Sequence, residues 1–268
     1  MKKKIIILGV NADIGFNICK YYLDRGDEII GTYRKKKPDI DTSFFKNRSK
    51  FLKCDVTKAK ELNKLKNFIS KKNFKWDLLF SSVGTTEPID LFFNTNFKQW
   101  EKSFNVNMIS QLKVIHMLHP LRNKKKICNI ALLAGGGTNN PFRYYSAYCL
   151  SKIALIKMCE LIYDENKDLN IFIIGPGYTR TKGHLETLKA GRRIGNHYYT
   201  VKKFWQSGKQ GTSFKKIFDC INWCIKVGPK TVSGRNISVV HDNWGTKKLK
   251  INLVKFDDMY KLRRFKNN

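Results

Sequence analysis

The sequence predicts a single α/β domain in which a doubly wound parallel sheet carries helices on both faces. Short apolar runs rich in Ile, Val, Leu and Phe alternate with amphipathic segments along the 268 residues, which is typical of parallel strands joined by helices. A glycine turn follows the first apolar run. Hydrophobic residues make up 42% of the chain, so disordered and collagen-like proteins are excluded.

The elements follow from this alternation. Strands are expected at residues 4–8, 28–33, 50–54, 77–82, 127–133, 170–174 and 236–240. Helices are expected at residues 14–25, 58–71, 97–121, 144–165 and 213–227. No repeat or composition shift marks a domain boundary, so residues 1–244 are interpreted as one domain. Residues 178–211 are interpreted as a mobile lid or insertion, and residues 245–268 as a basic tail that packs on a neighbouring subunit.

The net charge of +31, from 52 Lys and Arg against 21 Asp and Glu, raises the question of nucleic-acid binding. The lysines form short scattered clusters rather than one stripe with interleaved aromatic residues. We therefore interpret them as a solvated basic surface. The sequence predicts no nucleic-acid partner.

The opening MKKKIIILGV resembles a signal peptide, but its apolar run at residues 5–10 is too short for one and far too short to span a bilayer. No membrane association is therefore expected. The seven cysteines form no disulfide framework, which predicts reduced thiols and a cytoplasmic protein. Cys220 and Cys224 lie four apart without further ligands nearby, so no metal site is expected.

The turn after the first strand is a candidate phosphate site. It reads Gly9-Val10-Asn11-Ala12-Asp13-Ile14-Gly15, and such a turn lets the backbone approach a pyrophosphate at a helix N-terminus. The candidate contacts are Gly9, Asn11, Asp13, Ile14 and Gly15. Asp13 would cap the helix through its side chain, although its charge is awkward beside a phosphate. A purely structural turn is the alternative.

The end of the second strand bears on the choice of cofactor. It reads Thr32-Tyr33-Arg34, followed by three lysines. An acid at this point would bind the ribose hydroxyls of NAD, whereas an arginine accommodates the 2′-phosphate of NADP. The sequence therefore favours NADP with Arg34 as its contact, the alternative being ordinary surface charge.

The most specific catalytic signal is the pair Tyr148 and Lys152. Four residues apart on a helix, they share one face. The Lys152 cation would lower the pKa of Tyr148 and make the phenol a proton donor to a carbonyl or an acceptor from an alcohol.

The order of these motifs resembles the short-chain dehydrogenase/reductase family over about residues 3–244, which implies a Rossmann-like fold. The resemblance implies that Asp55 and Val56 contact the adenine and that Gly84 retains the glycine of the family's N-N-A-G. It also implies that Asn107 belongs to the catalytic tetrad and anchors a relay water. Pro176, Gly177 and Thr181 would close over the nicotinamide. Lys152 would also orient the ribose.

The tetrad serine is missing. Leu132 or Ala134 is expected at its position, and neither side chain donates a hydrogen bond. Loss of such a donor costs on the order of a hundredfold to a thousandfold in rate. Thr138 is the nearest hydroxyl and is the candidate substitute, against an ordinary loop residue.

Two functions remain open: an NADP-dependent oxidoreductase acting on a carbonyl or secondary alcohol, and a catalytically impaired sensor or scaffold of the same fold. Basic residues of the expected lid favour an anionic small-molecule substrate such as a nucleotide sugar; they are Arg180, Lys182, Lys189, Arg192 and Arg193. Residues 233–244 resemble family members of surface-polysaccharide pathways. The resemblance also implies a homodimer or homotetramer that pairs the helix bearing Tyr148 and the following one.

Overall fold

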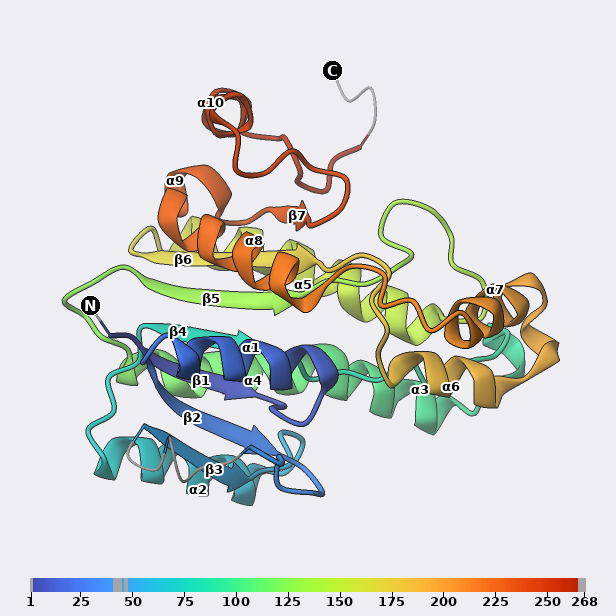
Figure 1. Cartoon of the computed structure of the whole chain (residues 1–268), viewed down its shortest axis with the longest axis horizontal. Coiled ribbons are helices and arrows are strands. Elements are labelled where there is room, and N and C mark those ends of the chain that lie inside the picture. The colour runs from blue at the N-terminus through green and yellow to red at the C-terminus, as the bar shows by residue number, and fades with distance from the viewer. Residues whose placement is uncertain (1, 41–44, 46–47, 265–268) are drawn as a thin grey trace.

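The computed structural model describes residues 2–40, 45 and 48–264. In this part of the chain one sheet contains β1 (Lys4–Leu8), β2 (Glu28–Tyr33), β3 (Ser49–Lys53), β4 (Leu78–Ser81), β5 (Cys128–Leu133), β6 (Leu169–Gly175) and β7 (Asn236–Ser238). All six pairings are parallel, in the order β3-β2-β1-β4-β5-β6-β7 (Figure 1). The predicted doubly wound parallel sheet is confirmed, and the strand order reverses between β1 and β4, where such sheets bind ligands.

The sequence of β1 is continuously apolar because both faces of this strand are covered. Ile5 and Ile7 face one hydrophobic cluster, while Ile6 and Leu8 face the other, and all four are fully buried. Successive side chains of a strand point to opposite faces, so a strand with both faces covered needs apolar residues at every position.

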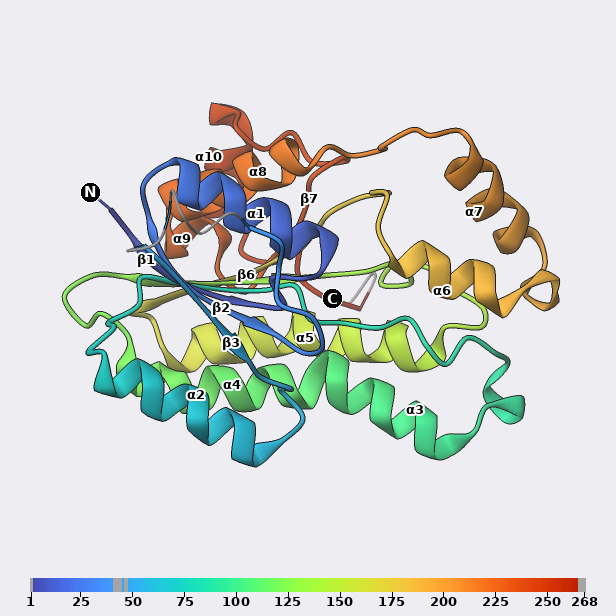
Figure 2. The same cartoon turned by 60° about the horizontal axis from the view of Figure 1, so that its bottom comes forward.

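Helices cover both faces of the sheet (Figure 2). One face carries α1 (Asp13–Asp24), α8 (Phe214–Val227), α9 (Pro229–Val232) and α10 (Lys247–Lys255), and the other carries α2 (Ala59–Lys71), α4 (Ser110–Leu118) and α5 (Ser146–Glu165). The helix expected at residues 97–121 is divided into α3 (Phe97–Phe104), a π-helical turn η2 (Asn105–Ile109), α4 and a 3₁₀ turn η3 (His119–Leu121). Pro120 lacks an amide hydrogen, so α4 ends before it.

Residues 178–211 contain helices that the sequence did not predict. They are α6 (Gly183–Ala190), the 3₁₀ turn η4 (Arg192–Ile194) and α7 (Asn196–Gln206). With α3 and the 3₁₀ turn η1 (Phe92–Asn94), they extend beyond the carboxyl ends of the strands (Figure 1). Ala190 and Ile194 are buried against Tyr145 and Ile89. The expected lid therefore packs on the body of the domain through an apolar cluster of its own.

The tail packs on its own chain. Leu249 and Leu253 of α10 are buried in the same cluster as α1 and α8. The buried Arg235 fixes the end of this helix, because its guanidinium donates to the carbonyl oxygens of Leu253 at 2.7 Å and Phe256 at 3.3 Å.

The described residues include no helix both long and apolar enough to cross a membrane. All seven cysteines are buried free thiols. In the same ranges, no three His, Cys, Asp or Glu side chains gather as metal ligands.

Candidate active site

The turn between β1 and α1 is held by close backbone contact. Gly9 has a φ of +77°, a conformation that favours glycine. A Cβ atom at Gly15 would lie 2.4 Å from the Gly9 carbonyl oxygen. The amide of Gly9 donates to Thr32 Oγ1 at 3.2 Å, and the amide of Gly15 donates to Ser82 Oγ at 3.1 Å. Both glycines are therefore required by the turn itself.

The same turn leaves main-chain donors free. The amides of Asn11, Asp13 and Ile14 make no hydrogen bond with any described residue. Free amides at a helix N-terminus, where the helix dipole is positive, form an anion site. These residues fit the pyrophosphate of a dinucleotide.

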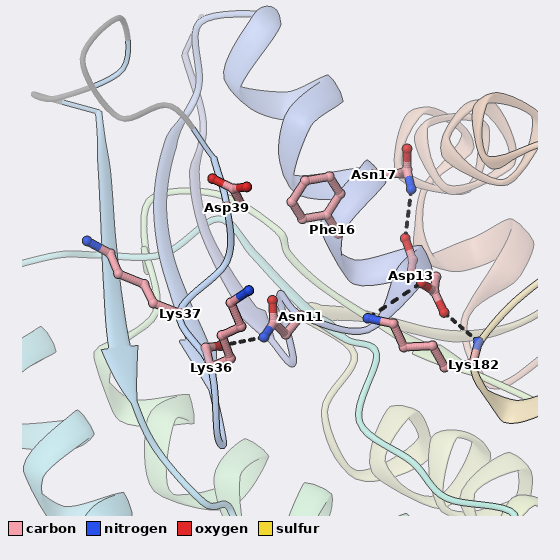
Figure 3. Close-up of a pocket in the computed structure, with 8 residues that line it drawn as sticks. All are labelled: Asn11, Asp13, Phe16, Asn17, Lys36, Lys37, Asp39 and Lys182. Carbon is pink, nitrogen blue, oxygen red and sulfur yellow. Dashed lines mark hydrogen bonds and ion pairs between the residues drawn. The ribbon is translucent and has the colours of Figure 1, made fainter. Parts of the chain in front are cut away.

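Asp13 does not cap α1 as the sequence predicted. The N-cap position is Ala12, and the Asp13 carboxylate points to residues 178–211 (Figure 3), where Oδ2 accepts a 2.6 Å hydrogen bond from the Lys182 amide. Lys182 Nζ lies 3.9 Å from Oδ1. A pocket of about 330 Å³ adjoins this contact, with Lys36 on its far side (Figure 3). The carboxylate is thus partnered by Lys182 rather than by its own helix.

A larger cleft of about 1440 Å³ runs along the carboxyl ends of β1, β2 and β4. The cleft is lined by six of the cofactor-binding candidates and by three basic residues of the expected lid: Gly9, Asn11, Arg34, Asp55, Val56 and Gly84, and Lys182, Lys189 and Arg193. Its volume suits a dinucleotide with room to spare.

The far end of this cleft has the features of an adenosine site. Arg34 follows β2, is exposed and forms no ion pair with a described acid. Asp55 accepts hydrogen bonds from the amide and hydroxyl of Thr57 at 3.0 and 2.7 Å. Burial alone would raise the pKa of Asp55, but the Thr57 hydrogen bonds and the Arg34 charge hold it below its usual value. The amide of Val56 is unbonded in the described part of the chain.

Tyr148 and Lys152 lie one turn apart in the first half of α5. Lys152 Nζ donates to the Leu133 carbonyl oxygen at 2.8 Å and lies 5.7 Å from the centre of the Tyr148 ring. Burial raises the pKa of Tyr148 and lowers the pKa of Lys152 to about 8. The expected lowering of the pKa of Tyr148 by the Lys152 cation is therefore wrong, because the loss of solvent around the phenol raises this pKa and outweighs the effect of the lysine.

Asn107 is fixed beside this pair by the π-helical turn η2. Its Oδ1 accepts from the Thr85 amide and its Nδ2 donates to the Thr85 carbonyl oxygen, both at 2.9 Å. A Cβ atom at Gly84 would lie 3.2 Å from Asn107 Oδ1 and 3.9 Å from Lys152 Nζ. Gly84 thus lets the asparagine and the lysine approach one another, a juxtaposition that the sequence predicted only by resemblance.

Backbone occupies the place beside the phenol where a serine side chain was sought. Leu132 and Ala134 are both buried in the sheet–helix core. The residue against the phenol is Gly135, where a Cβ atom would lie 2.0 Å from the Tyr148 hydroxyl oxygen. The Thr138 hydroxyl makes no hydrogen bond to any described residue. The structure therefore places Gly135, the first of three glycines, against the phenol, whereas Leu132 and Ala134 lie in the core.

The residues expected to close over the nicotinamide form a separate bend. Gly177 has a φ of +76°, and a Cβ atom there would lie 2.4 Å from Val240 Cγ2. The Thr181 carbonyl oxygen accepts a hydrogen bond from the His184 amide at 3.0 Å. Pro176, Gly177 and Thr181 do not line the cleft, and neither do Tyr148, Lys152 and Asn107.

Helix α6 contributes Glu186 to the lining of the cleft. Glu186 Oε2 accepts hydrogen bonds from the Thr86 amide at 2.7 Å, the Thr86 hydroxyl at 2.6 Å and the Thr85 hydroxyl at 3.2 Å. The next residue, Thr187, shares a 3.0 Å hydrogen bond with the Tyr145 hydroxyl. Sequence reasoning missed Glu186, because it lies in a segment without clear periodicity.

The fold and the cleft define a protein of the dinucleotide-binding α/β class, with a tyrosine and a lysine one helical turn apart on α5. The model of the family described as short chain dehydrogenase matches residues 3–190. The chain therefore belongs to the short-chain dehydrogenase/reductase family of NAD(P)-dependent oxidoreductases.

Individual relatives agree with this assignment. The chain is 26% identical over 193 residues to benzil reductase ((S)-benzoin forming) IRC24 of Saccharomyces cerevisiae. This alignment covers 68% of this chain and 73% of that protein. The solved structure of YIR035C from the same yeast superposes with a TM-score of 0.79 at 20% identity, over 92% of this chain and 98% of that one. A structure of ElxO with NADPH bound gives a TM-score of 0.72 at 20% identity, over 89% and 97%.

The contact between Gly135 and the phenol makes a prediction about stability. Gly135→Ala should lower the free energy of unfolding by about 1–3 kcal/mol, because the added methyl group overpacks the site. Tyr148→Ala in the same chain should remove most of that cost, because the colliding atoms are gone. Urea unfolding of the two single variants and the double variant measures the coupling. An equal cost with and without Tyr148 would contradict the contact.

Proposed function

We propose that this chain is an NADP-dependent oxidoreductase acting on a carbonyl or secondary alcohol of a small molecule. The observation that carries the proposal is that Asn107 and Lys152 both lie beside Gly84, which lines a cleft of dinucleotide size, while Lys152 lies 5.7 Å from the centre of the Tyr148 ring. The bound nicotinamide would supply or accept the hydride. The protein's part is to bind the reactants, orient them and move the proton.

The tyrosine carries the proton. Burial raises the pKa of Tyr148, so the phenol holds its proton at neutral pH and is suited to donate it to a carbonyl oxygen. Lys152 donates a hydrogen bond to the Leu133 carbonyl oxygen and, in this proposal, would orient a ribose. With glycine at position 135, Tyr148 is the side-chain donor on which the proposal relies.

A sensor or scaffold without catalysis is the second candidate. The observation favouring it is Gly135, which places no hydroxyl beside the phenol. The oxidoreductase is preferred because Tyr148, Lys152 and Asn107 are all retained and mutually packed, and a site under no catalytic constraint has no need of a buried lysine.

An anionic substrate remains a proposal supported by the rim of the cleft. Lys189 lies 3.9 Å from Glu87, and Arg193 lies 3.6 Å from Asp90. These pairs are wide and exposed, and such pairs contribute little. A phosphorylated metabolite such as a nucleotide sugar can compete for both cations.

Preference for NADP is tested at Arg34. Arg34→Ala should raise the Kd of NADPH by about tenfold to a hundredfold, the usual effect of losing hydrogen bonds to a charged group, and leave the Kd of NADH within about twofold. Fluorescence titration measures both constants. Lys230→Ala, which removes an exposed charge from α9, is the matched control. An equal rise in the Kd values of NADPH and NADH would contradict a contact of Arg34 with the 2′-phosphate.

Catalysis is tested at Tyr148. With NADPH and a panel of keto-sugar nucleotides and other carbonyl compounds, Tyr148→Phe should lower kcat by about a hundredfold or more while the Kd of NADPH stays within about threefold. Tyr199→Phe changes an exposed tyrosine of α7 and should be neutral. If cofactor binds but every carbonyl is refused by the unchanged chain, the sensor function replaces the enzyme. If no nicotinamide cofactor binds at millimolar concentration, both the oxidoreductase and the sensor function are contradicted.

We also propose a homodimer, or a tetramer built from it, that covers an aromatic surface formed by Phe92, Phe93 and Phe97. These side chains are 48%, 95% and 56% exposed, and contiguous exposed apolar side chains are typical of an interface. Trp100 stacks on Phe97 and donates to Ser146 Oγ at 3.0 Å, which joins the surface to α5.

Replacing the aromatic surface should break the assembly. Phe93→Lys combined with Phe97→Lys should convert dimers to monomers in sedimentation velocity, because a charge at each position opposes burial. Tyr199→Lys, at an exposed position on α7, should leave the assembly intact. A wild-type chain that sediments as a monomer at tens of micromolar would contradict the proposal.

A further inference from the structure

Glu186 is an unpaired carboxylate inside a strongly basic protein. It lines the cleft, and no described lysine, arginine or histidine lies within 4.0 Å of it. The acids nearer the rim are paired, Glu87 with Lys189 and Asp90 with Arg193. In a chain of net charge +31, Glu186 and Asp55 are the acids lining this cleft that have no described cation within 4.0 Å, and Asp55 lies at the adenosine end.

The carboxylate is held in one orientation. All three of its hydrogen bonds, from Thr85 and Thr86, fall on Oε2. Oε1 makes no hydrogen bond to a described residue and is not among the buried unsatisfied atoms, so it reaches solvent in the cleft. The negative charge is therefore fixed in place and open on one side.

The position of Glu186 relates it to the catalytic pair. Thr85, one of its donors, is also the residue that binds both side-chain atoms of Asn107. Thr85 follows Gly84, which adjoins Asn107 and Lys152. Tyr148 is close enough for the Glu186 charge to add to the rise in its pKa, after burial and Cys149. The carboxylate thus belongs to the nicotinamide end of the cleft rather than to its adenosine end.

We infer that Glu186 discriminates between the two redox states of the cofactor and favours the oxidised form. The inference rests on the proposed function. The oxidised nicotinamide ring carries a positive charge that the reduced ring lacks, so a fixed carboxylate attracts only the oxidised ring. A unit charge a few ångströms away in a partly buried site has an interaction large enough to change affinity tenfold or more.

A second role for Glu186 predicts a different result. If Glu186 only holds α6 against Thr85 and Thr86, it opposes entry of both cofactor forms alike. Removing its charge would then change both affinities by the same factor. The ratio of the two dissociation constants therefore distinguishes an effect of the Glu186 charge on the oxidised ring from a role of Glu186 in holding α6.

The experiment compares Kd values for NADP⁺ and NADPH by isothermal titration calorimetry. Glu186→Gln keeps the shape of the side chain and an acceptor oxygen for Thr86. We expect the preference for NADP⁺, expressed as Kd of NADPH over Kd of NADP⁺, to fall by about tenfold relative to the wild-type chain. Thermal unfolding of the variant checks that the fold is retained.

Two control variants isolate the charge. Glu61→Gln makes the same charge change at the adenosine end of the same cleft, where Glu61 Oε2 accepts the Asp55 amide at 2.7 Å; it should leave the ratio unchanged. Thr86→Val removes one hydrogen bond from Glu186 but keeps its charge, and should also preserve the ratio. A ratio in Glu186→Gln equal to that of the wild-type chain overturns the inference. Binding of neither cofactor form overturns the proposed function instead.

Discussion

The close approach of backbone to backbone in the turn between β1 and α1 is the constraint on which the site depends. Gly15 packs so tightly on the Gly9 carbonyl oxygen that no side chain fits there. This contact brings the start of α1 against the carboxyl edge of the sheet, with Ser82 at the end of β4 bonded to the Gly15 amide. The free amides of the turn then face the cleft, because the helix above them begins at Asp13.

The catalytic pair depends on a second set of glycines. Gly84 lets Asn107 and Lys152 meet, and Gly135 lets the chain pass directly against the phenol of Tyr148. Backbone rather than a side chain therefore lies against the phenol, and the surroundings of Tyr148 are tighter than a larger residue at position 135 would allow.

Charge in this protein is organised locally rather than globally. Its excess of cations is spread over the surface, and some cations of the cleft lie close to acids: Lys182 lies near Asp13, and Lys189 lies near Glu87. Glu186 and Asp55 differ from these acids, because their partners are hydroxyl and amide donors rather than cations. The interior of the cleft thus carries a negative charge beneath a positive rim, which matters for ligands that are cationic at one end and anionic at the other.

The sequence by itself determined the doubly wound parallel sheet and the candidates Gly9, Tyr148, Lys152 and Arg34, because hydrophobic period and short spacings are local properties. Tertiary structure decided what distant segments do together. Helix α6 has weak periodicity, and Ala190 at its end and Ile194 of the next turn η4 are buried in one cluster with Tyr145. Only that packing brings Glu186 to Thr86. The partner of Asp13 lies 169 residues away, and the residue facing the phenol depends on the path of a glycine loop. Contacts of this kind are not encoded in any local pattern.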